Sequence, residues 1–279
     1  MSKRIVVGLD PSDYSKMAVT LACIRASSFD GTVIGVGIID KPGIQAACHG
    51  AGVGAGHYAK RSREHHIKEA EEKVTALLEE FRGTCADHEV GCEPVLRQGS
   101  PAEILAEEAL TADLVIIGTR TFFHFETQTS HGDTLSDLLR CQACPVMVVP
   151  KALEMPIKRV IIPYDGTRKA SRSMRSFVSL THSLPVSLDL LLLAVDEKVE
   201  TKLADLEKPA KYLRAYGYEV ETKVVPGDAR EIIRDVAKVN MPTVVVLGAS
   251  EKSSVRVLLF GSVTQSLLDD GTIPLYVAG

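Results

Sequence analysis

Apolar and polar residues alternate along the chain in two different patterns. Short, nearly continuous apolar runs, such as residues 244–247, are typical of strands covered on both faces of a parallel sheet. Longer segments lie between them, and there apolar residues recur every three or four positions, as in an amphipathic helix. Strands that alternate with helices in this way indicate an α/β fold.

The pattern gives bounds for each expected element. Strands are predicted at residues 5–10, 32–39, 90–96, 113–118, 146–149, 159–165, 186–195, 219–225, 244–248 and 275–278. Helices are predicted at residues 14–27, 60–81, 101–110, 133–141, 169–181, 199–216 and 229–239, with a last one that begins at Gly261-Ser262.

The second half of the chain repeats the first, which indicates an internal duplication. The matching positions, first copy before second, are Asp10 and Asp165, Gly99 and Gly227, Gly132 and Gly261, Leu138 and Leu267, and Pro145 and Pro274. We therefore expect two domains, at residues 1–150 and 157–279, each built on a doubly wound, parallel, five-stranded sheet. Residues 150–157 contain two prolines and no periodicity, so they are expected to form the linker.

The first copy is longer mainly because of a glycine-rich insert at residues 41–57. Five glycines fall between Gly43 and Gly56, and ordering so many glycines is entropically costly. The insert is therefore predicted to be a mobile loop that leads into the charged helix at residues 60–81.

The stretch 244–277 is the best candidate for a binding site. A buried strand ends at Gly248, and a helix begins at Gly261-Ser262, where Ser262 and Gln265 have the spacing of a capping box. A helix N-terminus at the carboxyl end of a parallel strand can bind an anion such as phosphate.

Composition and charge narrow the function classes. The net charge of −4 gives no global attraction to nucleic acid or to an anionic membrane. The N-terminus does not read as a signal peptide, and the apolar run at residues 188–195 is too short to span a bilayer. We expect a soluble, cytoplasmic protein, and its six cysteines are too sparse for a disulfide scaffold.

At the predicted strand ends, an aspartate follows the first strand and a glycine ends the fourth, in both copies: Asp10 with Gly118, and Asp165 with Gly248. With this pattern the chain resembles a tandem universal stress protein over nearly its whole length. The resemblance implies a nucleotide-binding fold of strand order 3-2-1-4-5, related to the adenine nucleotide alpha hydrolases. Members that bind ATP carry the motif Gly-x2-Gly-x9-Gly-Ser/Thr after the fourth strand.

For the second copy, the resemblance implies a nucleotide site made of Asp165, Gly248, Gly261, Ser262 and Val263. Asp165 is expected to contact the adenine, and the glycines and the hydroxyl are expected to hold ribose and phosphates. The spacing agrees with the motif, but Glu251 stands at its middle glycine and places a carboxylate near the expected phosphates. Lys252 and Arg256 in the same loop could offset that charge.

The first copy departs further from the motif. Thr121 stands at the middle position, the span from Gly118 to Gly132 is one residue longer, and Asp133 replaces the serine. An aspartate caps a helix well, but here its carboxylate would fill the anion site. The first copy is not expected to bind ATP in the family manner.

Plainer and competing interpretations remain open. Asp10 and Asp165 could merely begin turns, and Ser262 could be an ordinary N-cap. Cys141 and Cys144 form a CxxC pair, but at a helix C-terminus, where the dipole disfavours a reactive thiolate. A zinc site is a further alternative, on residues without a recognised spacing: Cys48, His49, His57, His65 and His66. The apolar cluster at residues 122–125 favours packing but could cover the first pocket.

The preferred function is a stress-response regulatory protein that binds ATP, with or without Mg²⁺, or another adenine nucleotide in the second copy. No obvious general base is present, so any ATP hydrolysis should be slow. The alternatives are an interaction protein with decayed pockets, or a metal- or redox-responsive variant. The resemblance also implies that the final strands of the two copies lie side by side as a pseudo-dimer, and a homodimer of the whole chain is expected.

Overall fold

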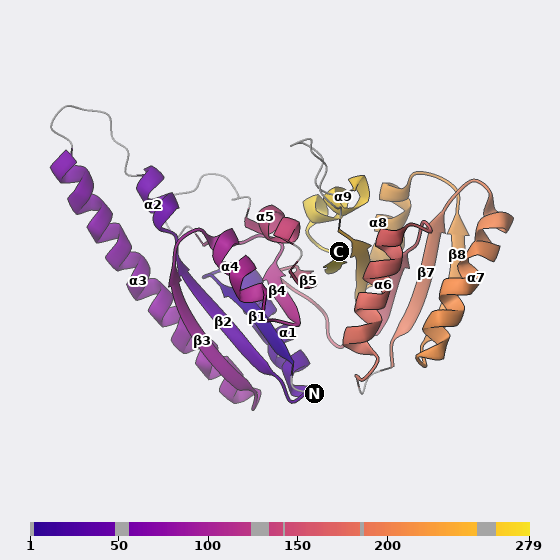
Figure 1. Cartoon of the computed structure of the whole chain (residues 1–279), viewed down its shortest axis with the longest axis horizontal. Coiled ribbons are helices and arrows are strands. Elements are labelled where there is room, and N and C mark those ends of the chain that lie inside the picture. The colour runs from indigo at the N-terminus through magenta and orange to yellow at the C-terminus, as the bar shows by residue number, and fades with distance from the viewer. Residues whose placement is uncertain (1–2, 48–55, 124–133, 142, 185–186, 250–260) are drawn as a thin grey trace. The chain divides into compact units, whose positions relative to one another are not determined.

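A computed structural model describes residues 3–47, 56–123, 134–141, 143–184, 187–249 and 261–279. The chain divides into two compact units, Met1–Ala143 and Cys144–Gly279. Each unit has a layer of strands with helices packed against it (Figure 1). The α/β class predicted from the alternating pattern is therefore confirmed.

The first unit is built on four parallel strands in the order β3-β2-β1-β4. Its strands are β1 (Arg4–Leu9), β2 (Thr32–Ile39), β3 (Gly91–Gln98) and β4 (Leu114–Gly118). Its helices are α1 (Asp13–Ser27), α2 (Lys41–Ala47), α3 (Gly56–Asp87), α4 (Pro101–Ala109) and α5 (Thr134–Cys141). Helix α1 packs against α3 and α4 packs against α5, so the two pairs cover the sheet (Figure 1).

The second unit has the complete predicted strand order 3-2-1-4-5, as β8-β7-β6-β9-β10. Its strands are β5 (Val146–Val149), β6 (Arg159–Pro163), β7 (Asp189–Val195), β8 (Glu219–Val225), β9 (Thr243–Gly248) and β10 (Leu275–Ala278). Its helices are α6 (Arg168–Thr181), α7 (Val199–Ala215), α8 (Ala229–Val239) and α9 (Ser262–Asp270).

Strand β5 completes the sheet of the second unit although it belongs to the first sequence copy. It pairs antiparallel with β10, with Val148 opposite Leu275 and Val146 opposite Val277. The expectation that the two final strands lie side by side is confirmed. This pairing satisfies the backbone groups of β10 that would otherwise form an open sheet edge.

Burial explains which strands lie in the interior. All residues of β4, and all but the first of β1 and β2, are buried, as expected for strands with helices on both faces. By contrast, β8 alternates exposed and half-buried residues because it lies at the end of its sheet. The alternating pattern of β8 therefore marks an edge strand, and the continuous patterns of β1, β2 and β4 mark strands covered on both faces.

The glycine-rich insert is only partly as predicted. Residues 41–47 form helix α2, so the expectation of a loop is wrong there. The Asp40 carboxylate accepts a hydrogen bond from the Gly43 N–H at 3.1 Å, and the Asp40 carbonyl accepts one from the Ile44 N–H at 3.0 Å. This cap offsets the low helix propensity of Gly43. Residues 48–55 lie outside the described part, and α3 is longer at both ends than the predicted helix at 60–81.

Residues 150–157 form neither helix nor strand, as expected for a linker, although Leu153 and Ile157 are buried. Among the described residues, we found no helix that combines the length and the apolar character needed to cross a membrane.

Candidate functional site

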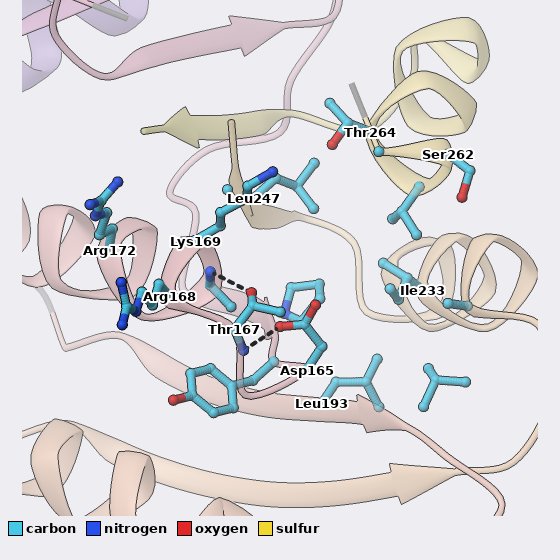
Figure 2. Close-up of a pocket in the computed structure, with 18 residues that line it drawn as sticks. Asp165, Thr167, Arg168, Lys169, Arg172, Leu193, Ile233, Leu247, Ser262 and Thr264 are labelled. Atoms are coloured by element: carbon cyan, nitrogen blue, oxygen red, sulfur yellow. Dashed lines mark hydrogen bonds between the residues drawn. The ribbon is translucent and has the colours of Figure 1, made fainter. Parts of the chain in front are cut away.

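The second unit contains a cavity of about 630 Å³ at the carboxyl ends of β6 and β9. It opens between the first turn of α6, the start of α9 and helix α8, whose Ile233 forms part of its wall (Figure 2). All of the residues predicted to bind a nucleotide line this one cavity: Asp165, Gly248, Gly261, Ser262 and Val263. The volume lies within the range of typical small-molecule sites, roughly 300–1,000 Å³.

Asp165 follows β6 and is exposed. One carboxylate oxygen accepts a hydrogen bond from the Thr167 N–H at 2.8 Å, and the Thr167 hydroxyl in turn caps α6 by accepting one from the Ala170 N–H at 3.2 Å. Lys202 donates to the Asp165 carbonyl oxygen at 3.2 Å. Asp165 therefore does begin a turn, as the plainer interpretation held, and that turn presents its side chain at the cavity.

Gly248 has a packing role that its motif position does not reveal. A Cβ atom at Gly248 would lie 3.0 Å from the carbonyl carbon and 3.0 Å from the Cβ of Lys169. Strand β9 therefore approaches the first turn of α6 so closely that a side chain at Gly248 would require the backbone of Lys169 to shift. The same holds in the first unit, where a Cβ at Gly118 would lie 2.5 Å from the Cβ of Tyr14. This glycine is explained in both copies without a ligand.

The predicted capping box at the start of α9 is wrong. The N-cap residue is Gly261, because its carbonyl already accepts the first helical hydrogen bond, from the Gln265 N–H at 3.2 Å. Ser262 is therefore the first residue of the helix, and the Gln265 side chain donates to Asp269 at 2.9 Å. The first-turn N–H groups of a helix have no partner within the helix, so those of α9 are suited to an anion.

The wall of the cavity has a charged part and an apolar part. Its described lining has cationic side chains at the start of α6, Arg168, Lys169 and Arg172, and a single carboxylate, Asp165. In Figure 2, Lys169 extends toward Leu247, whereas Arg168 and Arg172 lie on the side of α6 away from Ser262. The apolar part of the wall is made by Leu193, Val195, Ile233 and Leu247. Sequence reasoning did not include these cations, although the basic run at residues 168–172 was a signal for them.

The corresponding place in the first unit is filled. Phe123 is 1% exposed, and its ring atom Cζ lies 2.7 Å from where a Cβ of Gly8 would be; Leu105 lies 3.3 Å from the same point. Gly8 and Leu105 align with Pro163 and Ile233, which line the open cavity of the second unit. For Phe123 the suggestion of packing agrees with the structure, whereas Phe122 is 44% exposed and residues 124 and 125 lie outside the described part.

Asp10 is buried and hydrogen-bonded within the first unit, whereas its counterpart Asp165 is exposed. It is 3% exposed, and its two carboxylate oxygens accept hydrogen bonds from the Ser12 N–H and the Phe122 N–H, each at 2.8 Å. Burial raises the pKa of Asp10 above its ordinary value, and these hydrogen bonds only partly counteract it. The carboxylate therefore holds the segment after β4 in place.

A zinc site among the described histidines and a redox role of the CxxC pair gain little support. His65 and His66 both pair with Glu69, at 3.1 and 3.4 Å. Within the described ranges, no group of three or more His, Cys, Asp or Glu side chains could hold a metal ion. Cys141 lies at the C-terminal end of α5, as predicted, and its thiol donates to the Asp137 carbonyl at 3.4 Å.

Several residues named from the sequence lie outside the part that the structure describes: Cys48, His49, Gly132, Asp133, Glu251, Lys252 and Arg256, together with the side chain of His57. The middle position of the second-copy motif, and the acid that replaces the first-copy serine, therefore stay predictions.

Known proteins resemble the chain along its whole length. A family model described as the universal stress protein family matches it twice, over residues 1–150 and 156–279. Universal stress protein Slr1230 from Synechocystis sp. is 21% identical over 283 residues, 98% of each chain. A universal stress protein from Archaeoglobus fulgidus superposes with a TM-score of 0.73 at 19% identity, over 100% of this chain and 98% of that one. A functionally unknown protein from Pseudomonas aeruginosa PAO1 reaches 0.61 at 13% identity, over 99% and 92%.

Proposed function

The chain belongs to the universal stress protein family, and on that premise we propose that its second copy binds an adenine nucleotide, ATP or a shorter relative, in the cavity at the carboxyl ends of β6 and β9. The observation that carries this proposal is the convergence of the predicted residues, from Asp165 to Val263, on one cavity of about 630 Å³. They come from three separate places in the sequence: Asp165 after β6, Gly248 at the end of β9, and residues 261–263 at the start of α9.

The chemistry of the wall fits the parts of a nucleotide. Apolar side chains such as Leu193 and Ile233 offer surface to a flat base, and Asp165 can accept a hydrogen bond from an exocyclic amino group. The first turn of α9 offers N–H groups and the Ser262 hydroxyl to phosphate oxygens. Lys169 adds positive charge on the opposite side of the cavity, which favours a ligand with several negative charges (Figure 2).

The site is proposed to bind rather than to catalyse. Asp165 is the only carboxylate among the described lining residues, and one of its oxygens already accepts the Thr167 N–H. General-base catalysis requires a group within reach of the attacking water and a suitable pKa. We therefore propose that ATP, with Mg²⁺ when present, is held with little or no hydrolysis.

The remaining expectations belong to the same proposal. We propose domain limits at residues 1–150 and 157–279, a cytoplasmic location and a homodimer of the whole chain. The described cysteines Cys23, Cys85, Cys92, Cys141 and Cys144 are free thiols, which suits a reducing compartment.

Isothermal titration with ATP and Mg²⁺ tests the binding proposal, with Gly261→Glu as the decisive variant. A Cβ at Gly261 meets no atom within 4 Å, so the variant should fold, but it places a carboxylate at the start of α9. We expect ATP to bind the native chain at millimolar concentration or below and binding to Gly261→Glu to be lost.

Gly83→Glu is the matched control, because a Cβ there also meets no atom within 4 Å and the residue lies in α3 of the other unit. It should bind like the native chain. The absence of heat for the native chain at millimolar ATP, or native-like binding by Gly261→Glu, would overturn the proposal.

A further inference from the structure

Three thiols of the first unit gather away from the proposed nucleotide site. Cys23 of α1 and Cys85 of α3 are 0% and 1% exposed, and their sulfur atoms lie 3.7 Å apart. Cys92 of β3 is exposed, and its side chain interacts with that of Cys85. Cys85 therefore lies between the exposed thiol of Cys92 and the buried thiol of Cys23.

The second copy shows that packing does not require sulfur at these positions. The residues that align with Cys23, Cys85 and Cys92 are Val178, Leu213 and Val220. Sheet register supports the alignment, since Cys92 lies opposite Val33 in β2 and Val220 lies opposite Leu190 in the corresponding β7. Val178 and Leu213 are 1% and 0% exposed, so aliphatic side chains fill the same part of the core.

The three thiols differ in how readily they ionise. The hydrogen bond between the two thiols lowers the pKa of Cys23 and raises that of Cys85, so Cys23 loses its proton more readily than Cys85. Partial burial and the nearby Cys85 raise the pKa of Cys92, while the positive charge of Arg82 acts in the opposite direction. The buried pair therefore supplies a nucleophile and a neighbouring sulfur for it to attack.

We propose that Cys23, Cys85 and Cys92 form an oxidation site that takes up a hydroperoxide at the exposed Cys92 and stores the oxidation as a Cys23–Cys85 disulfide. Cys92 first gives its proton to solvent; its sulfur then attacks a peroxide oxygen, the O–O bond breaks, hydroxide (or alkoxide) leaves, and Cys92 becomes a sulfenic acid. The Cys85 thiol then attacks the Cys92 sulfur and passes its proton to the departing hydroxide, which forms a Cys85–Cys92 disulfide and water. Cys23 attacks the Cys85 sulfur and frees Cys92 as a thiolate.

With hydrogen peroxide as the oxidant, atoms and electrons balance over the three steps. Two thiols lose two electrons and two protons, and the peroxide becomes two molecules of water. From 3.7 Å, the sulfur atoms of Cys23 and Cys85 must approach to about 2.05 Å for the bond to form. The product links α1 to α3 across 62 positions of the sequence, so it should raise the melting temperature of the oxidised chain.

Peroxide treatment of the full chain followed by alkylation and peptide mass spectrometry tests this site. Trypsin combined with a glutamate-specific protease separates Cys85 from Cys92, because Glu89 lies between them. We expect a peptide pair that joins Cys23 to Cys85 and disappears on reduction. We expect Cys92→Val to slow its formation roughly tenfold or more, since access to a thiolate controls such reactions.

Cys141→Ser is the matched control, because it removes another exposed thiol and should leave the rate unchanged. Cys23→Val, which copies the second unit, should fold and should stop the oxidation at the Cys85–Cys92 disulfide. Two results would overturn the proposal: free Cys23 and Cys85 after peroxide treatment, or a native rate of Cys23–Cys85 linkage in Cys92→Val.

Discussion

The two copies place the same aspartate at the end of the same strand and then use it differently. Asp10 is buried and both of its carboxylate oxygens accept hydrogen bonds from backbone N–H groups, whereas Asp165 is exposed beside a cavity and accepts the Thr167 N–H. Phe123 fills the first copy at the place that corresponds to the open cavity of the second. The comparison teaches that a site residue inherited by both copies can become part of the core in one of them.

The two copies also differ in charge at the start of the first helix, α1 in the first copy and α6 in the second. At the start of the first helix, the second copy has Arg168, Lys169 and Arg172, and the first copy has Asp13, Tyr14 and Met17 at the aligned positions. The first turn of α6 therefore carries more positive charge than that of α1, which favours a ligand with several phosphates in the second copy. Phe123, which fills the first copy, and the difference in charge at the first helix therefore both favour ligand binding in the second copy.

Among the changes that test the difference between the two copies, removal of the Phe123 ring should have the largest effect on stability. Phe123→Ala leaves an empty volume beside Gly8 and Leu105, and we expect the free energy of unfolding to fall by about 3–5 kcal/mol. Urea denaturation measures the loss. Phe122→Ala is the matched control, because Phe122 is 44% exposed, and it should change stability by less than about 1 kcal/mol. Equal losses for the two variants would mean that Phe123 does not fill the site.

Truncating the two aspartates should give the next largest difference. Asp10→Ala leaves the N–H groups of Ser12 and Phe122 without their acceptor, at a cost of about 1–3 kcal/mol. Asp165→Ala removes one hydrogen bond at an exposed turn and should cost less than about 1 kcal/mol. Denaturation curves of both variants check this, and a larger loss for Asp165→Ala would reverse the assignment of roles.

Charge reversal at the start of α6 should weaken nucleotide binding without unfolding the chain. We expect Lys169→Glu to raise the dissociation constant for ATP roughly tenfold, or about 1.4 kcal/mol. Lys211→Glu, at an exposed position of α7, carries the same charge change outside the cavity and should bind normally. Calorimetric titration of the pair decides the matter, and identical affinities would remove Lys169 from the proposed site.

The pH dependence of stability should show the smallest effect. Burial raises the pKa of Asp10 above 3.8, so its contribution to stability is present below 3.8 and is lost as the pH rises through the raised value. Asp10→Asn removes this titration, so the native chain should lose stability relative to the variant as the pH increases over that range. Urea midpoints of both proteins measure the difference, and a constant difference would contradict a raised pKa.

The sequence was sufficient for most of the fold because the apolar periodicities are strong. The bounds of β5, β8, α8 and β10 agree with the predicted ones residue for residue. Helix α2 was missed because its glycine and proline predict a loop, whereas a single cap at Asp40 stabilises the helix. Such a cap depends on one side chain and leaves no periodic signal.

The candidate site was predictable only in part. The motif spacing placed Asp165, Gly248 and Gly261 together, because strand ends and helix starts meet at one edge of a parallel sheet. It could not show that Gly248 is required by Lys169, or that Gly261 rather than Ser262 caps α9. Nor could it show that Phe123 turns inward, because the burial of a loop residue is decided by tertiary packing.

The pairing of β5 with β10 means that the repeat in sequence and the module in space have different limits. The second family match begins at residue 156, whereas the second compact unit begins at Cys144. A fragment cut at the start of the second match would lack β5 and expose the backbone edge of β10, and such edges tend to pair with other chains. A fragment that begins at Cys144 keeps β5 and with it the pairing of β10, so the unit in space is one strand longer than the second sequence repeat.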